Sequence, residues 1–195
     1  GLAGVAVAAD HRRRGLARRM CVHALRIGRS RGAVFSALYP FRTSFYASLG
    51  YTLVGTLHRH RFAPSDLPLY PGWDRVVRAR TPGEVRAVYE AAAARSNGLI
   101  GRSEAAWHFL HDPRFGVFVH VTPEGDASGY VVTRTQRARV GQRLRVVELV
   151  ALDVPAHEAL LGWVAAQSDQ FTEVVHDALP GERLETRLRN ARRIG

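Results

Sequence analysis

One short stretch of the chain combines residue types that bind phosphate groups. It contains three consecutive arginines, Arg12 to Arg14, followed by Gly15 and, one residue later, by Ala17. If a helix begins there, the amide groups of its first turn lack carbonyl partners and carry partial positive charge, which attracts an anion. Glycine lets the backbone approach a phosphate closely, and arginine adds charge-assisted hydrogen bonds. The stretch therefore predicts a phosphate site, with a basic helix start that binds nothing as the alternative.

A second stretch, Phe45 to Tyr51, offers a candidate proton donor. Phe45-Tyr46 is followed, after three residues, by Gly50-Tyr51. A phenol within hydrogen-bonding distance of a leaving group can supply the proton that makes its departure easier. Most tyrosines instead pack with their hydroxyl groups hydrogen-bonded. We expect the first role for Tyr46 and the second for Tyr51.

The hydrophobic pattern places both stretches at the ends of regular elements. Residues 5–8 alternate as a half-buried strand does, and apolar residues recur at helical spacing from Leu16 to Ile27. A second strand is expected over 33–39, a short helix over 44–49, and an extended segment over 51–62. The phosphate motif thus lies between a strand and a helix.

A proline-rich break over 63–75 separates this segment from a second one. There a capping box, Thr81 to Glu84 with Pro82 at the first helical position, opens a helix up to about residue 96. The other expected elements are strands over 76–80, 116–122, 130–136, 143–153 and 171–178, and helices over 103–110, 155–167 and 184–191. The fold class is mixed α/β.

The two motifs and the order of the elements resemble the GCN5-related N-acetyltransferase (GNAT) superfamily. Arg12-x-x-Gly15-x-Ala17 is similar to the family motif Arg/Gln-x-x-Gly-x-Gly/Ala, and Phe45 to Tyr51 is similar to its Phe-Tyr-x-x-x-Gly-Tyr/Phe stretch. Within the superfamily, the chain most resembles the enhanced intracellular survival (Eis-like) acetyltransferases. It departs from them at Ala9, where a proline is usual, and at Phe41, where many relatives have a serine.

The resemblance implies two GNAT-type units in tandem. Residues 1–62 correspond to a first unit without its opening strands, residues 63–75 to a linker, and residues 76–195 to a second, degenerate unit that ends early. The chain is therefore expected to be a piece of a longer protein. In the second unit, the turn from Asp153 to Ala159 lacks the phosphate motif, so we expect it to bind no cofactor.

The resemblance also implies the chemistry. It assigns proton donation to the leaving thiolate to Tyr46, and contacts with the pantetheine arm of acetyl-CoA to the main chain of Val5, Ala6 and Val7. The implied reaction is direct attack by a primary amine of a small molecule, aminoglycoside-like or unknown. In Eis-like proteins the base is the terminal carboxylate of a domain that this sequence does not contain, so the base for this chain is left open. The resemblance also implies that the full-length protein forms homo-oligomers. The residues assigned to the pyrophosphate are Arg12, Arg13, Arg14, Gly15, Leu16, Ala17 and Arg18.

A non-catalytic fragment that binds CoA or another protein is the alternative from another class. DNA or RNA binding is a third hypothesis, raised by the formal net charge of +11. All 28 basic residues are arginines spread along the chain, and no nucleic-acid-binding motif accompanies them. A solvated surface therefore explains the charge better.

The remaining features favour ordinary structural roles. No apolar run is long enough for a membrane span and no signal-peptide pattern is present, so we expect a cytoplasmic location. Cys21, the single cysteine, is expected to be a buried thiol. His58 and His60 favour a metal only weakly, and the polar and aromatic residues from Trp107 to Asp112 fit the core and rim of a helix. No metal site is predicted.

Overall fold

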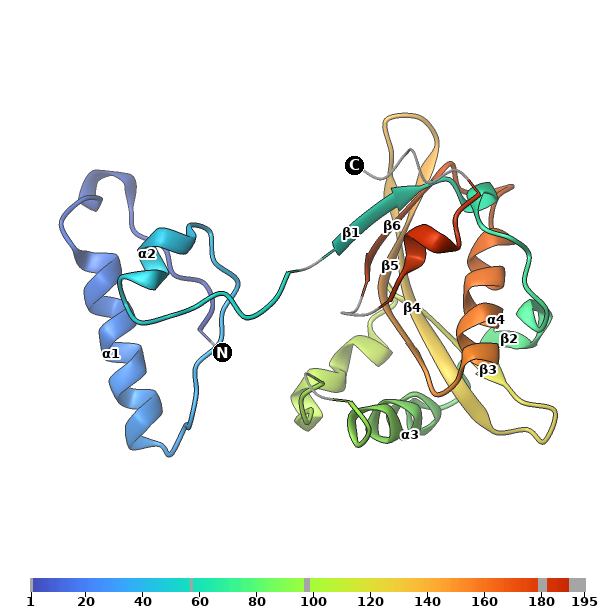
Figure 1. The fold of residues 1–195 in the computed structure, drawn as a ribbon, viewed down its shortest axis with the longest axis horizontal. Helices are drawn as coiled ribbons and strands as arrows, with labels where there is room; N and C mark the ends of the chain where they lie inside the picture. Colours follow the sequence, from blue (N-terminus) through green and yellow to red (C-terminus); the bar gives the residue numbers. More distant parts are fainter. Residues whose placement is uncertain (1, 57, 97–98, 179–181, 190–195) are drawn as a thin grey trace. The chain divides into compact units, whose positions relative to one another are not determined.

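The computed structural model describes residues 2–56, 58–96, 99–178 and 182–189 (Figure 1). The contacts within the chain divide it into two units, Gly1–Thr56 and Leu57–Gly195. Helices occur in both units, and the second contains a mixed sheet, which confirms the predicted α/β class. None of the helices in the described ranges combines the length and the apolarity that a membrane span needs.

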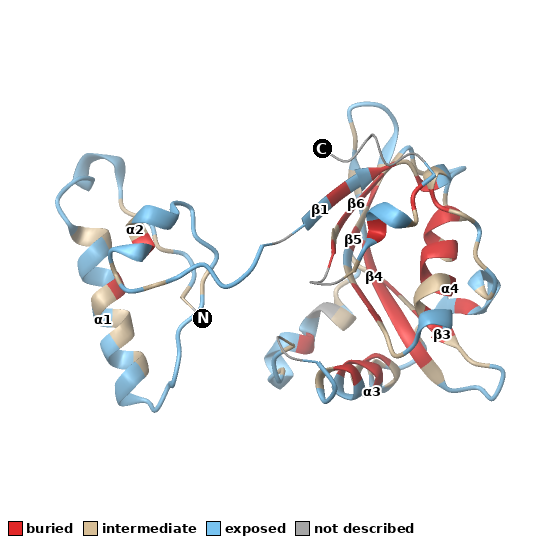
Figure 2. Cartoon of the chain, in the orientation of Figure 1, coloured by how far each residue is buried: buried red, intermediate tan, exposed pale blue. Residues whose placement is uncertain are grey.

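The first unit is built on two helices, α1 (Leu16–Ser30) and α2 (Thr43–Ala47), after a single 3-10 turn at Ala9–His11. A glycine follows each helix within three residues and adopts the left-handed backbone conformation that other residues avoid. Gly32 has a φ of 79° and Gly50 a φ of 91°. Among the described residues of this unit, only Cys21 and Tyr46 are buried (Figure 2).

The strands expected over 5–8 and 33–39 do not form in the described structure, and of the extended segment expected over 51–62 only His58–Phe62 forms a strand. A strand needs a ladder of hydrogen bonds to a neighbouring strand. The main-chain bond that the described residues show between the start of the chain and the second segment comes from Leu2, which lies ahead of the first segment and whose amide donates to the carbonyl of Ala37 at 2.9 Å. The first two segments contain no regular secondary structure, so the strand pairing that the sequence pattern predicted is absent from them.

The second unit contains one six-stranded sheet in the order β1-β6-β5-β4-β3-β2. Neighbouring strands are antiparallel except β5 and β6, which are parallel. Helix α4 (Val154–Ala165) joins these two, because parallel strands need a long crossover connection. The strands are β1 (His58–Phe62), β2 (Val76–Arg78), β3 (Gly116–Val121), β4 (Ala127–Arg137), β5 (Gln142–Ala151) and β6 (Glu173–Ala178).

The two faces of the sheet have separate cores. Alternation along β4 sends Val131 to one face and its neighbours Tyr130 and Val132 to the other. On the first face the sheet packs against α4, and on the second against α3 (Pro82–Ala93) and the 3-10 segment Glu104–His111. In Figure 2 the buried residues accordingly follow β4, α3 and α4.

Among the helices expected in the second unit, α3 begins as predicted and two others differ from the prediction. The capping box is confirmed, because the amide of Thr81 donates to Glu84 Oε2 at 3.2 Å. The helix expected over 103–110 is a 3-10 segment. The helix expected over 184–191 is a single 3-10 turn, Leu184–Thr186, within residues 182–189; residues 190 and 191 lie outside the described ranges. The amide of Arg189 donates to the carbonyl of Asp66 at 2.7 Å, which replaces the bond that a helix would need.

The expected boundary at residue 62 differs from the structure, because β1 belongs to the sheet of the second unit. Arg59 donates to Asp177 at 2.7 Å and Arg61 to Glu173 at 3.1 Å, both acids lying on β6. The alternate residues His60 and Phe62 are buried on the other face. A strand with one charged and one buried face pairs best with a strand whose charges are opposite.

Residues 63–75 are not a free linker either. Leu67 is buried, with 2% of its surface exposed, and the main chain of Tyr70 crosses α4 at Gly162. A Cβ atom on Gly162 would lie 2.8 Å from both the nitrogen and the oxygen of Tyr70. Prolines exclude regular helix and strand in this segment, but they do not prevent it from packing.

We predict that Gly162→Ala destabilises the protein by about 1–3 kcal/mol, because two main-chain atoms cannot move aside for the added methyl group. Gly83→Ala is the matched control. Gly83 is an exposed helical glycine on α3, and its nearest neighbour to a Cβ is Thr81 Oγ1 at 3.7 Å.

Urea denaturation followed by circular dichroism measures both variants. The control should be unchanged or up to about 1 kcal/mol more stable. Equal stability of the two variants would contradict the close packing of Tyr70 on α4.

Candidate active site in the first unit

The phosphate motif forms a tight turn ahead of α1. Gly15 is the N-cap residue of this helix and has a left-handed φ of 75°. Arg13, with a φ of 61°, is the one residue other than glycine with a positive φ among those described. A Cβ atom on Gly15 would meet nothing within 4 Å. The protein therefore needs this glycine for the backbone conformation and leaves the space beside it open.

The start of α1 presents unsatisfied hydrogen-bond donors. Its first main-chain bond runs from the amide of Arg19 to the carbonyl of Gly15 at 3.1 Å, so the amides of Leu16, Ala17 and Arg18 precede the helical ladder. No side chain caps this terminus and its first turn contains no acidic residue. The preceding Arg12, Arg13 and Arg14 are all exposed. The turn therefore concentrates amide donors and positive charge at one place.

The corresponding helix of the second unit has a side-chain cap at its N-terminus. Asp153 precedes α4, and its carboxylate accepts a hydrogen bond from the amide of Ala156 at 2.7 Å. Pro155 in the first turn contributes no amide hydrogen. A carboxylate at this position occupies the donors and repels a second anion. The structure thus gives a physical reason for the absence of the phosphate motif from this turn.

The segment before the turn alternates between half-buried and exposed side chains. Val5 and Val7 are half-buried and Ala6 is exposed, so the alternation expected of a strand persists in the burial of the side chains. Arg12 Nε donates to the carbonyl of Val7 at 3.3 Å. This bond ties the extended segment to the arginines of the turn.

Tyr46 lies in the small core of this unit, with 5% of its surface exposed. Its ring makes edge-on contacts with Phe41, Phe45 and Tyr51 at centroid distances of 5.5, 5.0 and 5.8 Å. Burial raises the pKa of the Tyr46 phenol, and the neighbouring Cys21 and Tyr51 raise it further. The phenol is therefore protonated at neutral pH, as a proton donor must be.

Tyr51 has the packing role that we expected. It is half-buried, and its hydroxyl group forms a hydrogen bond with Ser36 Oγ at 2.7 Å. The amide of Tyr51 also donates to the carbonyl of Tyr46 at 3.1 Å. These two bonds anchor the segment that follows α2.

One arginine joins the turn to the helix that carries Tyr46. Arg18 Nη1 donates to the carbonyl of Ser48 at 3.1 Å and lies 3.3 Å from Ser48 Oγ. Sequence reasoning assigned Arg18 only to the phosphate turn, and nothing in the sequence marked Ser48 as its partner. The fold thus brings the two predicted motifs, 30 residues apart at this contact, together.

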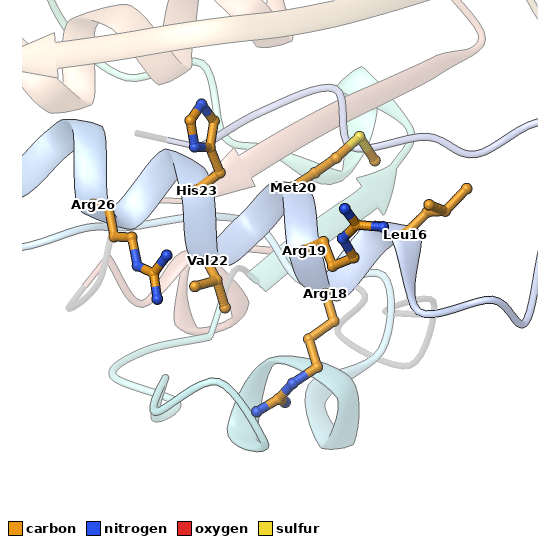
Figure 3. A pocket seen from close by; sticks show the side chains of 7 residues that line it. All are labelled: Leu16, Arg18, Arg19, Met20, Val22, His23 and Arg26. Carbon is orange, nitrogen blue, oxygen red and sulfur yellow. The ribbon is translucent and has the colours of Figure 1, made fainter.

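A shallow hollow runs along α1 (Figure 3). One helix supplies all of its lining and cannot enclose a ligand, so the hollow is at most one wall of a site. Its lining residues are Leu16, Arg18, Arg19, Met20, Val22, His23 and Arg26.

The other candidates from the sequence are structural. Within the described ranges, no group of three or more His, Cys, Asp or Glu side chains is arranged to hold a metal ion. Trp107 is buried and stacks edge-on against Tyr89 at 5.4 Å. His108 Nδ1 contacts the carbonyl of Ala105 at 2.6 Å. These residues form the core and rim that the helical spacing predicted.

Two models of the acetyltransferase (GNAT) domain match the chain, one over residues 1–54 and the other over residues 98–195. The second match covers half of the chain, and the chain therefore belongs to the GNAT acetyltransferase family. The family inferred from the two motifs is thus confirmed.

Among characterised relatives, the chain is similar to the N-acetyltransferase Eis of Mycobacterium bovis and Mycobacterium tuberculosis. The identity is 31% over 210 residues, which covers 96% of this chain and 51% of each relative. The Eis-like resemblance is confirmed by this match. The chain spans about half the length of the curated relatives it matches.

Solved structures show the same fold. A GCN5-related N-acetyltransferase from Kribbella flavida is 27% identical, with a TM-score of 0.74 over 95% of this chain and 46% of its own. One from Anabaena variabilis is 21% identical, with a TM-score of 0.77 over 93% of this chain and 48% of its own.

Two buried histidines, His60 and His176, lie opposite each other on neighbouring strands of the second unit, a pairing that sequence reasoning missed. His60 of β1 faces His176 of β6, and neither ring nitrogen of His60 has a hydrogen-bond partner. Burial lowers the pKa of His60, and His176 and His58 lower it further, while Glu185 and Glu182 partly oppose this. His60 is therefore held neutral.

A depressed histidine pKa stabilises the fold fully above the ordinary value of 6.5, and this contribution is lost as the pH falls through the folded value. We predict that the free energy of unfolding declines as the pH falls below about 6.5, where the unfolded chain takes up a proton on His60 before the folded chain does. Urea denaturation at several pH values measures this decline.

His60→Leu should make the decline smaller, because it removes one titrating group, while burial also lowers the pKa of His120 on β3, which keeps part of the decline. His58→Gln, at the exposed position two residues earlier on the same strand, removes only the smallest of the effects on the pKa of His60 and should change the decline much less than His60→Leu does. A decline of the same size in His60→Leu as in the parent protein would assign it to other groups.

Proposed function

We propose that the turn from Arg12 to Arg18 binds the pyrophosphate of acetyl-CoA. The observation that carries the proposal is the uncapped start of α1, where the left-handed Gly15 leaves open space beside the amides of Leu16, Ala17 and Arg18. A diphosphate has the size and the charge to accept hydrogen bonds from these donors. The exposed side chains of Arg13 and Arg14 complement its charge.

The extended segment before the turn supports the rest of the cofactor in this proposal. Acetyl-CoA supplies a thioester whose carbonyl carbon is open to attack by an amine. The main chain of Val5, Ala6 and Val7 leads directly into the turn and would bind the amide groups of the pantetheine arm. Arg12, which donates a hydrogen bond to the carbonyl of Val7, would hold this segment at a fixed position relative to the turn.

Tyr46 would act as the general acid. The amine nitrogen forms a bond to the carbonyl carbon, the carbon–sulfur bond breaks, and the phenol of Tyr46 donates its proton to the departing sulfur. The amine loses its extra proton to water, and the phenolate regains one from solvent. The raised pKa of Tyr46 keeps the phenol protonated until a thiolate develops beside it.

The acceptor that we propose is a primary amine of a small molecule, by analogy with the N-acetyltransferase Eis. A non-catalytic CoA-binding fragment is the second candidate. It is favoured by the thin core of the first unit, where only two of the described residues are buried. A cytoplasmic location and homo-oligomers of the full protein stay predictions.

We predict that Ala17→Glu lowers the affinity for acetyl-CoA at least about tenfold, because a carboxylate at the start of α1 repels the pyrophosphate. The same carboxylate interacts favourably with the helix dipole, so the folded state should not be weakened. Isothermal titration calorimetry measures the affinity.

Ala24→Glu is the matched control. Ala24 is also half-buried and lies on the same face of α1, two turns further along. Its affinity should stay within about threefold of the parent protein. Unchanged affinity in Ala17→Glu would remove the phosphate site from this turn.

We predict that Tyr46→Phe keeps the affinity for acetyl-CoA and lowers turnover about 10²-fold, because the ring still packs while the proton is missing. Release of the CoA thiol in the presence of a panel of primary amines measures turnover. Tyr51→Phe, which changes a packing tyrosine, should lower turnover much less.

Two results would change the proposal. If Tyr46→Phe turns over as fast as the parent protein, Tyr46 is only a packing residue. If the parent protein binds acetyl-CoA and acetylates no amine tested, the non-catalytic fragment becomes the better account.

A further inference from the structure

Arg18 takes part in both halves of the candidate site. Its main-chain amide belongs to the uncapped first turn of α1, where the pyrophosphate would bind. Its side chain points away from this first turn. Figure 3 shows the guanidinium group extending from α1 away from Leu16 and Met20, and its contacts are with Ser48.

Ser48 lies directly after α2, and its carbonyl group is among those that the end of a helix leaves without an internal partner. A cation is favourable at this end, because the helix dipole is negative there. Ser48 Oγ donates to the carbonyl of Phe45 at 2.7 Å, so its lone pairs point outward and can accept from Arg18. The serine thus offers two acceptors to one guanidinium group.

Helix α2 needs such an anchor. With five residues and no side-chain cap at its first residue, it is too short to be stable by itself. Its position is fixed by contacts with residues outside the helix: the rings of Phe41 and Tyr51 against Tyr46, the bond from the amide of Tyr51 to the carbonyl of Tyr46, and the bonds from Arg18. Among these, the bonds from Arg18 are the ones that join α2 to the phosphate turn.

We propose that Arg18 is a positioning residue, whose side chain holds the helix of Tyr46 at a fixed place relative to the pyrophosphate turn. The inference rests on the function proposed above. A general acid must lie within hydrogen-bonding distance of the leaving sulfur, and a displacement of about 1 Å can cost 10²-fold in rate. The competing role for the same side chain is a direct contact with the phosphates.

Arg18→Ala tests the proposal, with Arg19→Ala as the control of equal charge at the next, exposed position of α1. We expect turnover of Arg18→Ala to fall about tenfold while its affinity for CoA stays within about threefold of that of Arg19→Ala. A loss of CoA affinity beyond tenfold in Arg18→Ala alone would assign the guanidinium group to the phosphates and overturn the proposal. Unchanged turnover would overturn it as well.

A second measurement needs no cofactor and no turnover. Absorbance at alkaline pH follows the ionisation of tyrosines, and the difference between each protein and its Tyr46→Phe counterpart isolates Tyr46. If Arg18 holds α2 in place, Arg18→Ala exposes the phenol and moves its titration to lower pH, whereas Arg19→Ala does not. Identical titrations in both variants would overturn the positioning role.

The two measurements separate this inference from the proposed function. If the parent protein binds no CoA, the proposed function fails, and the tyrosine titration still decides whether Arg18 positions Tyr46. Arg18→Lys adds a further check, because it keeps the charge and loses the planar group that reaches two acceptors. It should recover turnover only in part, and full recovery would reduce the role of Arg18 to its charge.

Discussion

The amide groups at the start of an α-helix have no carbonyl partners within the helix. The candidate site depends on whether a side chain caps these groups or leaves them available to a ligand. At α4 the carboxylate of Asp153 accepts from one of them and a proline removes another. At α1 a left-handed glycine begins the helix and no side chain caps it. The two helix starts therefore differ in the hydrogen-bond donors that they leave for an anion. Under the proposed function, this difference is the reason that the cofactor site lies at α1 and not at α4.

Much of the fold was predictable where a local rule decides the outcome. The capping box at Thr81, the glycine ends of α1 and α2, and the alternation in β3 to β6 all follow from interactions within a few residues. The wrong expectations depended on distant partners. The strand β1 belongs to the second unit because the arginines on its outer face meet acids of β6 more than a hundred residues away. Sequence spacing contains no information about such pairs.

In the candidate site, too, local features were predictable and contacts between distant residues were not. The spacing of Arg12, Gly15 and Ala17 predicted a helix start, and the structure confirms that a helix begins there. There are two reasons for a glycine at position 15: its backbone conformation, shown by its φ of 75°, and the space that a bound group needs. The sequence alone does not distinguish between them. The contact between Arg18 and Ser48 joins two motifs that sequence reasoning treated separately. Only the fold reveals that the two motifs share a residue.

Folding and chemistry are closely coupled in the first unit, because Tyr46 is one of its two buried residues among those described. Burial of the ring joins α1 to α2, and the same burial raises the pKa of the phenol. One packing event therefore sets both the position and the protonation state of the proposed acid. A larger core would let evolution adjust these properties separately. Here any change that loosens the contact between the helices also makes the phenol a different acid, so the aromatic neighbours Phe41, Phe45 and Tyr51 constrain the chemistry as much as the packing.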